Sequence, residues 1–573
     1  MPPGQPNAAT ITVREALQLL DAQFADFAAG VNEGEYALWL GSGISRGRVV
    51  GLNGVLRKII EFLRTRIATV DVNCAFRLAL DHVLTHAVLS EDEQARVNYD
   101  VDSAQWPDIE TILERLAERY SRVLDVSVTG QAADYLLWVA ADFCQTFANQ
   151  EPDAEHLCIV IMVAEGAVPV LVSANWDGLL EGAARELGLG PEIFRVCVTG
   201  EDFRGPLAAA RLLKFHGCAL RAIENDAQYR PLLIARWSQI VNWAVNNAFT
   251  AMREELVGVA AQMRTLMIGM SAQDPNAQSL FQLARQRTAW RWDDAPPAHV
   301  FGTNEIGEDQ KTVLRTAYGE ADYTANQQYI LERSCFRAYG KPLLAALVLN
   351  MLSDKLCKLF EHVEMPSRQE SDLQELSSGI RHLRDAVGAA VSENKLGFVR
   401  SLARHLSRAK AMLQEGRPAI ENPVRYRPIT NRPGHHILND PNVVATGQGE
   451  AAKALALLGL GMRDGHWDLA LENLSDRRSG VLRARSQLRE ARLMFVAHDN
   501  ADVRLFNEGA YSEDDDDVVI VHSMDPGERQ TRSPAKRLPG ARVGPRHVAI
   551  GKLARECQNL DELRTLFRQE VGL

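Results

Sequence analysis

The chain has 573 residues, of which 46% are hydrophobic and 24% are charged, and its formal net charge is −11. This composition is typical of a globular protein with several domains, and it lacks the basic surplus expected of a nucleic-acid-binding chain. No apolar run approaches the roughly 20 residues of a membrane helix, and the N-terminus does not resemble a signal peptide. We therefore expect a cytoplasmic protein that by itself binds neither membranes nor nucleic acid.

Eight cysteines are scattered along the chain, and none forms a C-x-x-C pair. Structural zinc sites usually need thiolates paired at short spacing. The sequence therefore predicts no metal site, and it predicts reduced, mostly buried thiols.

The first part of the chain alternates apolar strands with helices. Apolar side chains recur at helical spacing over residues 11–34 and again over 53–70, and residues 75–150 are predicted to be almost entirely helical. Strands are predicted at 36–40, 168–172, 193–198, 211–215, 264–271 and 298–305. This alternation predicts an α/β fold with a doubly wound, Rossmann-like parallel sheet and a helical insertion at 75–150.

After residue 335 long amphipathic helices replace the strands, at 335–363 and 370–415. The stretch 342–363 is the most apolar, and it either packs onto the sheet domain or forms an interface with another subunit. A linker rich in Pro, Asn and Arg is predicted at 417–442, and it is followed by a helix pair at 450–474 that resembles one helical-hairpin repeat.

The last residues predict a small α/β unit, with strands at 491–498 and 517–523 and a terminal helix from 551. The basic segment 526–547 is either a solvated loop or a surface for an anionic partner. These boundaries predict a catalytic domain at 1–334, a helical region at 335–416 and a C-terminal domain at 417–573. The C-terminal domain is assigned to assembly or partner binding.

Short polar segments follow the predicted strands, at the edge where open parallel sheets bind ligands. They are "GSGIS" (41–45), "SANWD" (173–177), "LKFHG" (213–217), "GMSAQDPN" (269–276) and, more weakly, "GTNE" (302–305).

Taken singly, each segment has a plain alternative. Gly41 and Gly43 would let backbone N–H groups approach a phosphate, but they also suit an ordinary strand–helix turn. Asn175 and Asp177 could simply cap the following helix, and His216 could be structural. The first loop lacks the P-loop pattern, and Arg46 stands where the dehydrogenase fingerprint has its third glycine.

Taken together and in this order, the segments resemble the sirtuin (silent information regulator) superfamily over about residues 30–310. The resemblance implies NAD binding, with Asn175 and Asp177 near the nicotinamide ribose and His216 as the general base. It places the rest of the cofactor against Gly41, Ser42, Gly43, Ser45, Gly269, Ser271, Asp274 and Asn304.

The departures from the family's pattern indicate which kind of member this is. Residues 218–263 contain only Cys218, so the zinc ribbon of protein-deacylating sirtuins is missing. "RGRVVGLNGVLRKI" replaces the family's G-I-P-D-F-R, and 130 residues separate Ser45 from Asn175. The pattern is more similar to bacterial defence-associated sirtuin-like effectors, which hydrolyse NAD to ADP-ribose and nicotinamide.

The resemblance thus implies an NAD glycohydrolase, with NAD as substrate and no metal, that acts as the effector of an anti-phage abortive-infection system. Such an effector must be inactive until triggered, so we expect a homo-oligomer and a partner protein such as a HerA-type ATPase or a short Argonaute. The alternatives are an NAD-dependent ADP-ribosyltransferase or deacylase and a non-catalytic nucleotide sensor. The missing ribbon disfavours deacylation, and the presence of Asn175 and His216 disfavours the sensor.

Overall fold

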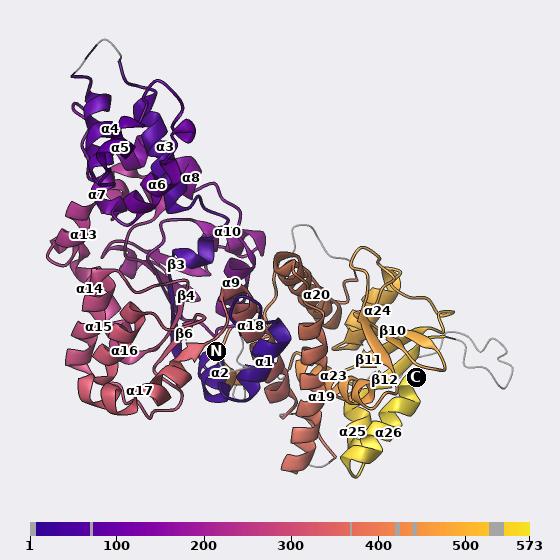
Figure 1. The fold of residues 1–573 in the computed structure, drawn as a ribbon. Helices are drawn as coiled ribbons and strands as arrows, with labels where there is room; N and C mark the ends of the chain where they lie inside the picture. Colours follow the sequence, from indigo (N-terminus) through magenta and orange to yellow (C-terminus); the bar gives the residue numbers. More distant parts are fainter. Residues whose placement is uncertain are drawn as a thin grey trace.

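The computed structural model forms an elongated molecule with two β-sheets (Figure 1). A helical lobe lies at one end, the larger sheet follows it, and the smaller sheet lies at the other end. The residues described are 7–68, 71, 73–361, 363–366, 369–418, 425–437, 440, 443, 445–525 and 544–573.

The larger sheet has the strand order β3-β4-β2-β1-β5-β6-β7, and all its strand pairs are parallel. Its strands are β1 (Tyr36–Leu40), β2 (Val170–Ser173), β3 (Phe194–Cys197), β4 (Ala210–Lys214), β5 (Arg264–Ile268), β6 (His299–Gly302) and β7 (Cys335–Phe336). From β1 the sheet extends through β2 to β4 and β3 on one side and through β5 to β6 and β7 on the other, so the predicted doubly wound α/β fold is confirmed. Each predicted strand overlaps one of β1 to β6, and β7 lies just past the boundary predicted at residue 334.

The central strand shows why this sequence forms a doubly covered sheet. All five residues of β1 are buried, and alternate side chains point to opposite faces. Leu38 and Leu40 belong to one apolar core, whereas Ala37 and Trp39 belong to another.

Helices cover both faces of this sheet. The Leu38 face is covered by α1 (Val13–Asp21), α2 (Ala25–Asn32), α9 (Ala154–Ala164), α10 (Leu179–Glu186) and α18 (Gly340–Phe360). The Trp39 face is covered by α14 (Thr250–Gln262), α15 (Pro275–Arg287), α16 (Glu308–Tyr318) and α17 (Glu320–Ser334). The apolar stretch predicted at 342–363 corresponds to α18, which is buried against α1 and α9 on one side and against helices of the C-terminal half on the other. This is the packing alternative rather than a free interface.

A helical lobe with its own apolar core lies beyond the carboxyl edge of the sheet (Figure 1). Its helices are α3 (Leu52–Arg64), α4 (Ala75–Thr85), α5 (Glu91–Ala95), α6 (Ile109–Ala117), α7 (Tyr120–Leu124), the π-helical turn η3 (Leu136–Ala140) and α8 (Phe143–Phe147). Short helices between β4 and β5 in the chain complete this end: α11 (Ala219–Glu224), α12 (Asp226–Tyr229) and α13 (Trp237–Trp243).

The smaller sheet has the order β12-β11-β10-β9-β8, parallel on the β12 side of β10 and antiparallel on the other. Its strands are β8 (Asp468–Leu471), β9 (Leu482–Arg485), β10 (Glu490–Val496), β11 (Val518–His522) and β12 (Arg546–Ala549). The helices around it are α19 (Glu370–Ala389), α20 (Lys395–Glu415), α21 (Gly434–Ile437), α23 (Gln448–Arg463), α24 (Asp499–Asn507), α25 (Ile550–Glu556) and α26 (Leu560–Val571).

One prediction in this half is wrong. The segment 450–474 is not a helix pair, because only its first part, within α23, is helical and its second part is the edge strand β8. Gly465 ends the helical stretch with φ +76, a conformation that other residues adopt at a cost. The basic segment at 526–547 lies largely outside the described residues, at 526–543.

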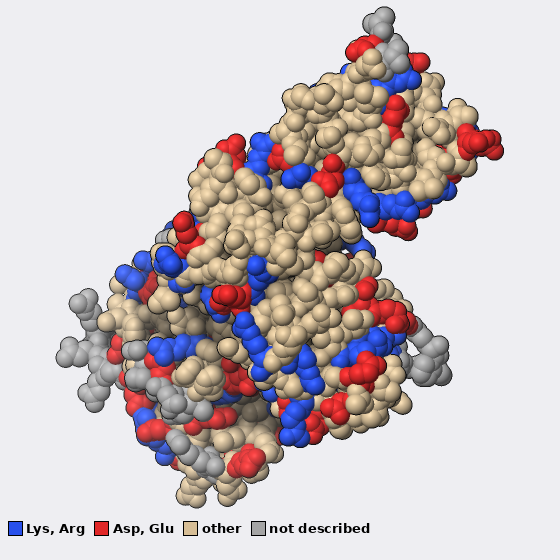
Figure 2. All heavy atoms as spheres, turned by 90° about the vertical axis from the view of Figure 1, so that its left-hand side faces the viewer, with Lys and Arg blue, Asp and Glu red and all other residues tan. Residues whose placement is uncertain are grey.

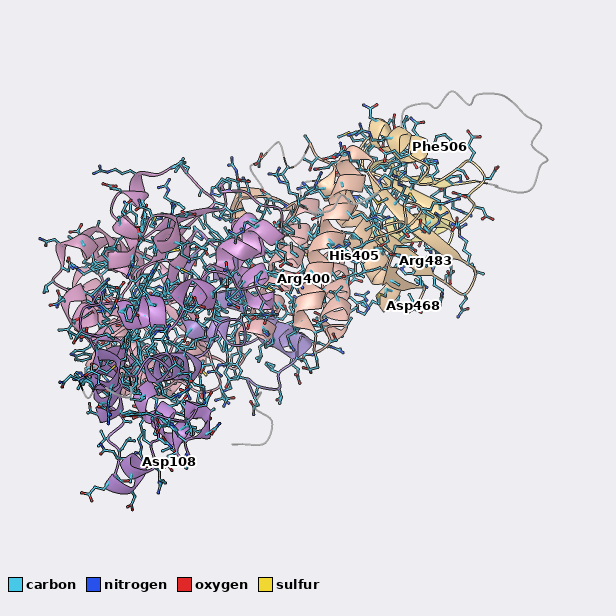
Figure 3. The ribbon with its side chains drawn as sticks, turned by 90° about the horizontal axis from the view of Figure 1, so that it is seen from above. Asp108, Arg400, His405, Asp468, Arg483 and Phe506 are labelled. Carbon is cyan, nitrogen blue, oxygen red and sulfur yellow. The ribbon has the colours of Figure 1, made fainter. Side chains whose placement is uncertain are left out.

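Helix α20 connects the two halves, and Figure 3 shows Arg400 and His405 on it between the sheets. The Arg400 guanidinium donates to both carboxylate oxygens of Glu186 on α10, at 2.6 and 3.0 Å. About two turns further on, the buried Arg408 donates to backbone carbonyls of residues 473, 476 and 479 beside the smaller sheet. One helix therefore makes charged contacts with both halves.

The segment that follows α20 is held by a buried carboxylate. Glu165, at the end of α9, is fully buried and accepts a hydrogen bond from Lys355 on α18 at 2.8 Å. The same carboxylate accepts from the Tyr426 hydroxyl at 2.7 Å and from the Ile429 N–H at 2.9 Å. The described part of the predicted linker is therefore fixed against the larger sheet's helices.

All eight cysteines are free, five of them buried and three partly buried, which confirms the expectation of unpaired thiols. Among the described residues, no helix combines the length and the apolar character that crossing a bilayer requires.

Candidate functional site

The loops that follow β1 and β5 lie directly against each other at the carboxyl edge. The Gly41 N–H donates to the Ile268 carbonyl at 3.1 Å, and the Gly43 N–H donates to the Gly269 carbonyl at 3.0 Å. A Cβ at Gly41 would lie 2.4 Å from the Gly269 oxygen, and one at Gly43 would lie 2.5 Å from the Gly269 Cα. Gly269 itself has φ +63. The three glycines are thus explained by close loop packing at the point where the strand order diverges, which is where such sheets bind ligands.

Replacing Gly41 by alanine is expected to separate these loops and to destabilise the protein by about 1–3 kcal/mol, because the added methyl meets backbone atoms that cannot rotate away. Thermal unfolding of the full-length variant measures the loss of stability. Gly258→Ala is the matched control, because it lies in α14 with nothing within 4 Å of an added Cβ. That change is expected to stabilise α14 by about 0.5–1 kcal/mol. Equal melting temperatures for Gly41→Ala and the wild type would contradict the packing role.

Ser45, Asn175 and Asp177 form one hydrogen-bonded network beside the first loop. The Asn175 side-chain NH₂ donates to the Gly41 carbonyl at 3.0 Å and to the Ser45 hydroxyl oxygen at 3.2 Å. The Ser45 hydroxyl in turn donates to Asp177 Oδ2 at 2.8 Å. Because the amide nitrogen is used in this way, the Asn175 carbonyl oxygen is the atom left to face a ligand.

Asp177 also stabilises the local structure at the start of α10. Its Oδ1 accepts from the Leu179 N–H at 3.2 Å at the start of α10, and its backbone carbonyl accepts from Lys214 at 2.6 Å. Only 8% of Asp177 is exposed. These contacts are those of the capping alternative, and they position Ser45 and Asn175 rather than present the carboxylate to solvent.

His216 follows β4 and faces a carboxylate from another loop. Its Nε2 lies 2.8 Å from Oδ2 of Asp274, and the two side chains are 13% and 20% exposed. Burial alone would raise the pKa of Asp274, but the contact with His216 and the N–H groups of α15 hold that pKa below its ordinary value. The carboxylate is therefore ionised at neutral pH, and it also caps α15 by accepting from the Asn276 N–H at 2.8 Å.

This pairing gives His216 a defined orientation. A carboxylate beside one ring nitrogen holds the ring in place and leaves the other nitrogen as the atom that can take a proton from a ligand. The Phe215 ring packs against the imidazole with centroids 4.3 Å apart, and the His216 carbonyl accepts from the Ile234 N–H at 2.9 Å.

The other predicted residues are dispersed. Ser42 and Ser271 are exposed on their loops. Asn304, after β6, accepts a hydrogen bond from the backbone N–H of Ala8 at 3.0 Å, so its side chain contacts the N-terminal segment. No contact in the described residues joins Asn304 to the Asn175 network.

Two groups at this edge were not predicted from the sequence. Burial, and then the charge of Asp274, raise the pKa of Tyr120, a tyrosine of the helical lobe. Glu155, at the start of α9, has one carboxylate oxygen without a partner among the described residues, and burial raises its pKa to about 7. Perturbed carboxyl groups of this kind gather at functional sites. Neither residue stands in a sequence pattern, because only the fold places them at the edge.

A cavity of about 410 Å³ lies at the same edge, beyond β6 and β7. Its lining includes Ile306, Leu331 and Cys335 together with the polar ends of Lys311 and Gln327. It does not include His216 or Asn175, so it is a separate space on the β7 side of the glycine loops.

Comparison with protein families and with curated proteins finds no match. Comparison with solved structures finds, among others, one described as the structural basis for the mechanism and regulation of Sir2 enzymes. That chain is 12% identical, and the match covers 53% of this chain and 96% of that one, with a TM-score of 0.23. At this score the two chains do not superpose closely enough for residue roles to be transferred. What is established is a doubly wound α/β protein with an Asn–Ser–Asp network and a His–Asp pair at the carboxyl edge of its sheet.

Proposed function

We propose that this protein hydrolyses NAD to ADP-ribose and nicotinamide. The observation that carries the proposal is the partly exposed His216 beside an ionised Asp274, at the sheet edge that also holds Asn175 and the two glycine loops. These are the segments whose order along the chain resembles the sirtuin pattern.

The reaction suits these groups. The bond between nicotinamide and ribose C1′ breaks, nicotinamide leaves as a neutral amine with the bonding electrons, and positive charge develops on the ribose as in glycoside hydrolysis. Water adds to C1′ and loses a proton, which the free nitrogen of His216 accepts. The Asn175 carbonyl oxygen is available to orient that water or a ribose hydroxyl without itself ionising.

In this proposal the remainder of the dinucleotide also binds at this edge of the sheet. In the proposed arrangement it crosses the loops after β1 and β5 and extends toward Asn304 and the cavity beside β7. The cavity's mixture of apolar walls and a few polar groups is typical of small-molecule sites.

We further propose a role as the effector of an anti-phage system that is inactive until triggered. The position of the helical lobe beyond the carboxyl edge of the sheet (Figure 1) supports it as a cover for the site. On the face that Figure 2 shows, acidic and basic side chains are interspersed, which suits a protein partner better than nucleic acid on that face. In this proposal a homo-oligomer and a partner such as a HerA-type ATPase or a short Argonaute control the activity.

The test follows the products of NAD. Purified full-length protein is incubated with labelled NAD, and nicotinamide, ADP-ribose and labelled protein are quantified. The wild-type protein and the Asn175→Ala variant are then expressed in a bacterial host, and cellular NAD is measured before and after phage infection. Equal amounts of nicotinamide and ADP-ribose, or loss of NAD on infection that Asn175→Ala prevents, support the hydrolase.

Two other outcomes identify the alternatives. Transfer of the label to protein indicates an ADP-ribosyltransferase, and binding of NAD without turnover in either setting indicates a sensor. Unchanged NAD with no binding contradicts the proposal.

A further inference from the structure

Three side chains with metal-binding atoms meet in the C-terminal half, far from the site described above. Asp502 lies on α24, His522 is the last residue of β11 and His547 lies on β12, so three separate elements supply them. Asp502 and His522 are fully buried, and the His547 side chain is 27% exposed.

The two histidines face each other on one side of the sheet. Strands β11 and β12 are parallel neighbours, with His547 opposite Ile520, two residues before His522. Residues two apart on a strand share a face, and Ile520 belongs to the apolar core on the side that α24 covers. Both imidazoles therefore point toward α24, whose Asp502 points back at them.

The distances between the three donor atoms are those of a coordination site. His522 Nε2 lies 2.9 Å from His547 Nδ1, and Asp502 Oδ2 lies 3.7 Å from the first and 3.8 Å from the second. A triangle with these sides has a circumscribed radius of about 2.0 Å, which matches the Zn–N and Zn–O distances found in proteins. A single ion can therefore contact all three atoms without moving them.

The groups around the donors also fit such a site. The Tyr511 hydroxyl donates to the other oxygen of Asp502, which fixes the carboxylate as outer partners of metal ligands do. Two imidazole nitrogens and one carboxylate oxygen favour Zn²⁺ or a similar transition metal over Ca²⁺ or Mg²⁺, which prefer oxygen ligands.

We propose that Asp502, His522 and His547 bind one divalent transition-metal ion, Zn²⁺ by this ligand set. The ion joins α24 to the β11–β12 side of the smaller sheet. Its fourth position lies toward the exposed side of His547, where a water or an external donor completes the coordination. The sequence predicted no metal site because it lacks paired cysteines. That criterion does not detect a site made of two histidines and an aspartate.

The test uses full-length protein stripped with EDTA and then titrated with Co²⁺ and Zn²⁺. The visible absorption of bound Co²⁺, displacement by Zn²⁺ and elemental analysis are expected to give one ion per chain. Zn²⁺ is also expected to raise the melting temperature, because an ion that binds only the folded state stabilises it.

Two variants test the ligands. Asp502→Asn keeps the size of the side chain, and His547→Gln changes a partly exposed position, so both can be checked for native far-UV circular dichroism. Each is expected to weaken Co²⁺ binding by at least about 10-fold and to remove the Zn²⁺-dependent rise in melting temperature.

A matched control is available on α4. His82 and His86 form another histidine pair with ring centroids 5.4 Å apart. His82→Ala is expected to leave the stoichiometry unchanged. The proposal is overturned if the wild type binds no stoichiometric metal, if both ligand variants bind as it does, or if His82→Ala removes the ion.

Discussion

Replacing His216 by alanine is expected to reduce NAD cleavage by about 10²–10⁴-fold, the range that a positioned acid–base group contributes. The imidazole is 13% exposed, so a ligand at the sheet edge can contact it. It also faces the Asp274 carboxylate at 2.8 Å, which holds the ring in one orientation. Initial rates of nicotinamide release at saturating NAD measure the effect.

The fold is expected to survive this change, because the backbone carbonyl of His216 keeps its bond from the Ile234 N–H. His466→Ala, at an exposed turn after α23, is the control and is expected to leave the rate unchanged. Asp274→Asn tests the positioning residue and is expected to lower kcat with little change in KM, provided that the α15 cap is kept by the amide oxygen. Full activity in a folded His216→Ala protein would remove this histidine from the mechanism.

Replacing Glu165 by alanine is expected to destabilise the protein by about 3–5 kcal/mol, the usual effect of removing one partner from a buried ion pair. Lys355 is 1% exposed, and the change would leave its ammonium group without a counter-ion. It would also deprive the Tyr426 hydroxyl and the Ile429 N–H of their acceptor. The melting temperature and the urea midpoint of the full-length protein measure the loss.

A double variant separates the ion pair from the rest of the packing. Glu165→Gln combined with Lys355→Met removes both charges and keeps much of the volume, so it is expected to be less destabilising than Glu165→Ala alone. If the double variant is as unstable as the single one, the stability resides in packing and in the bonds to 426–430 rather than in the buried charge. Limited proteolysis at 425–430 shows whether that segment has detached from the helices of the larger sheet.

The parallel sheet could be predicted because its strands are short, continuous apolar runs. β1 is buried along its whole length, and such runs bounded by small residues are the direct sequence signature of a sheet covered on both faces. The same pattern failed at 450–474, where periodicity does not distinguish a second short helix from the largely exposed edge strand β8.

The candidate site was predicted in part. Since the carboxyl ends of parallel strands share one edge, the sequence placed residues 41–45, 173–177, 213–217 and 269–276 together. The assignment of Gly41 and Gly43 to a phosphate of the cofactor stays a prediction, and what the sequence did not show is that their N–H groups donate to the Ile268 and Gly269 carbonyls. That contact depends on how closely two loops approach, which the sequence of either loop does not express.

By itself, then, the sequence determined the fold class and the edge of the sheet at which chemistry is expected, because both follow from local hydrophobic patterns and from the geometry of parallel strands. Only the tertiary structure decided that His216 faces Asp274, that Glu165 holds Lys355 and Tyr426, and that Asp502, His522 and His547 meet. These pairs are separated by 20 to more than 200 residues in the chain. Their contacts are set by loop paths and helix packing, and no local periodicity records them.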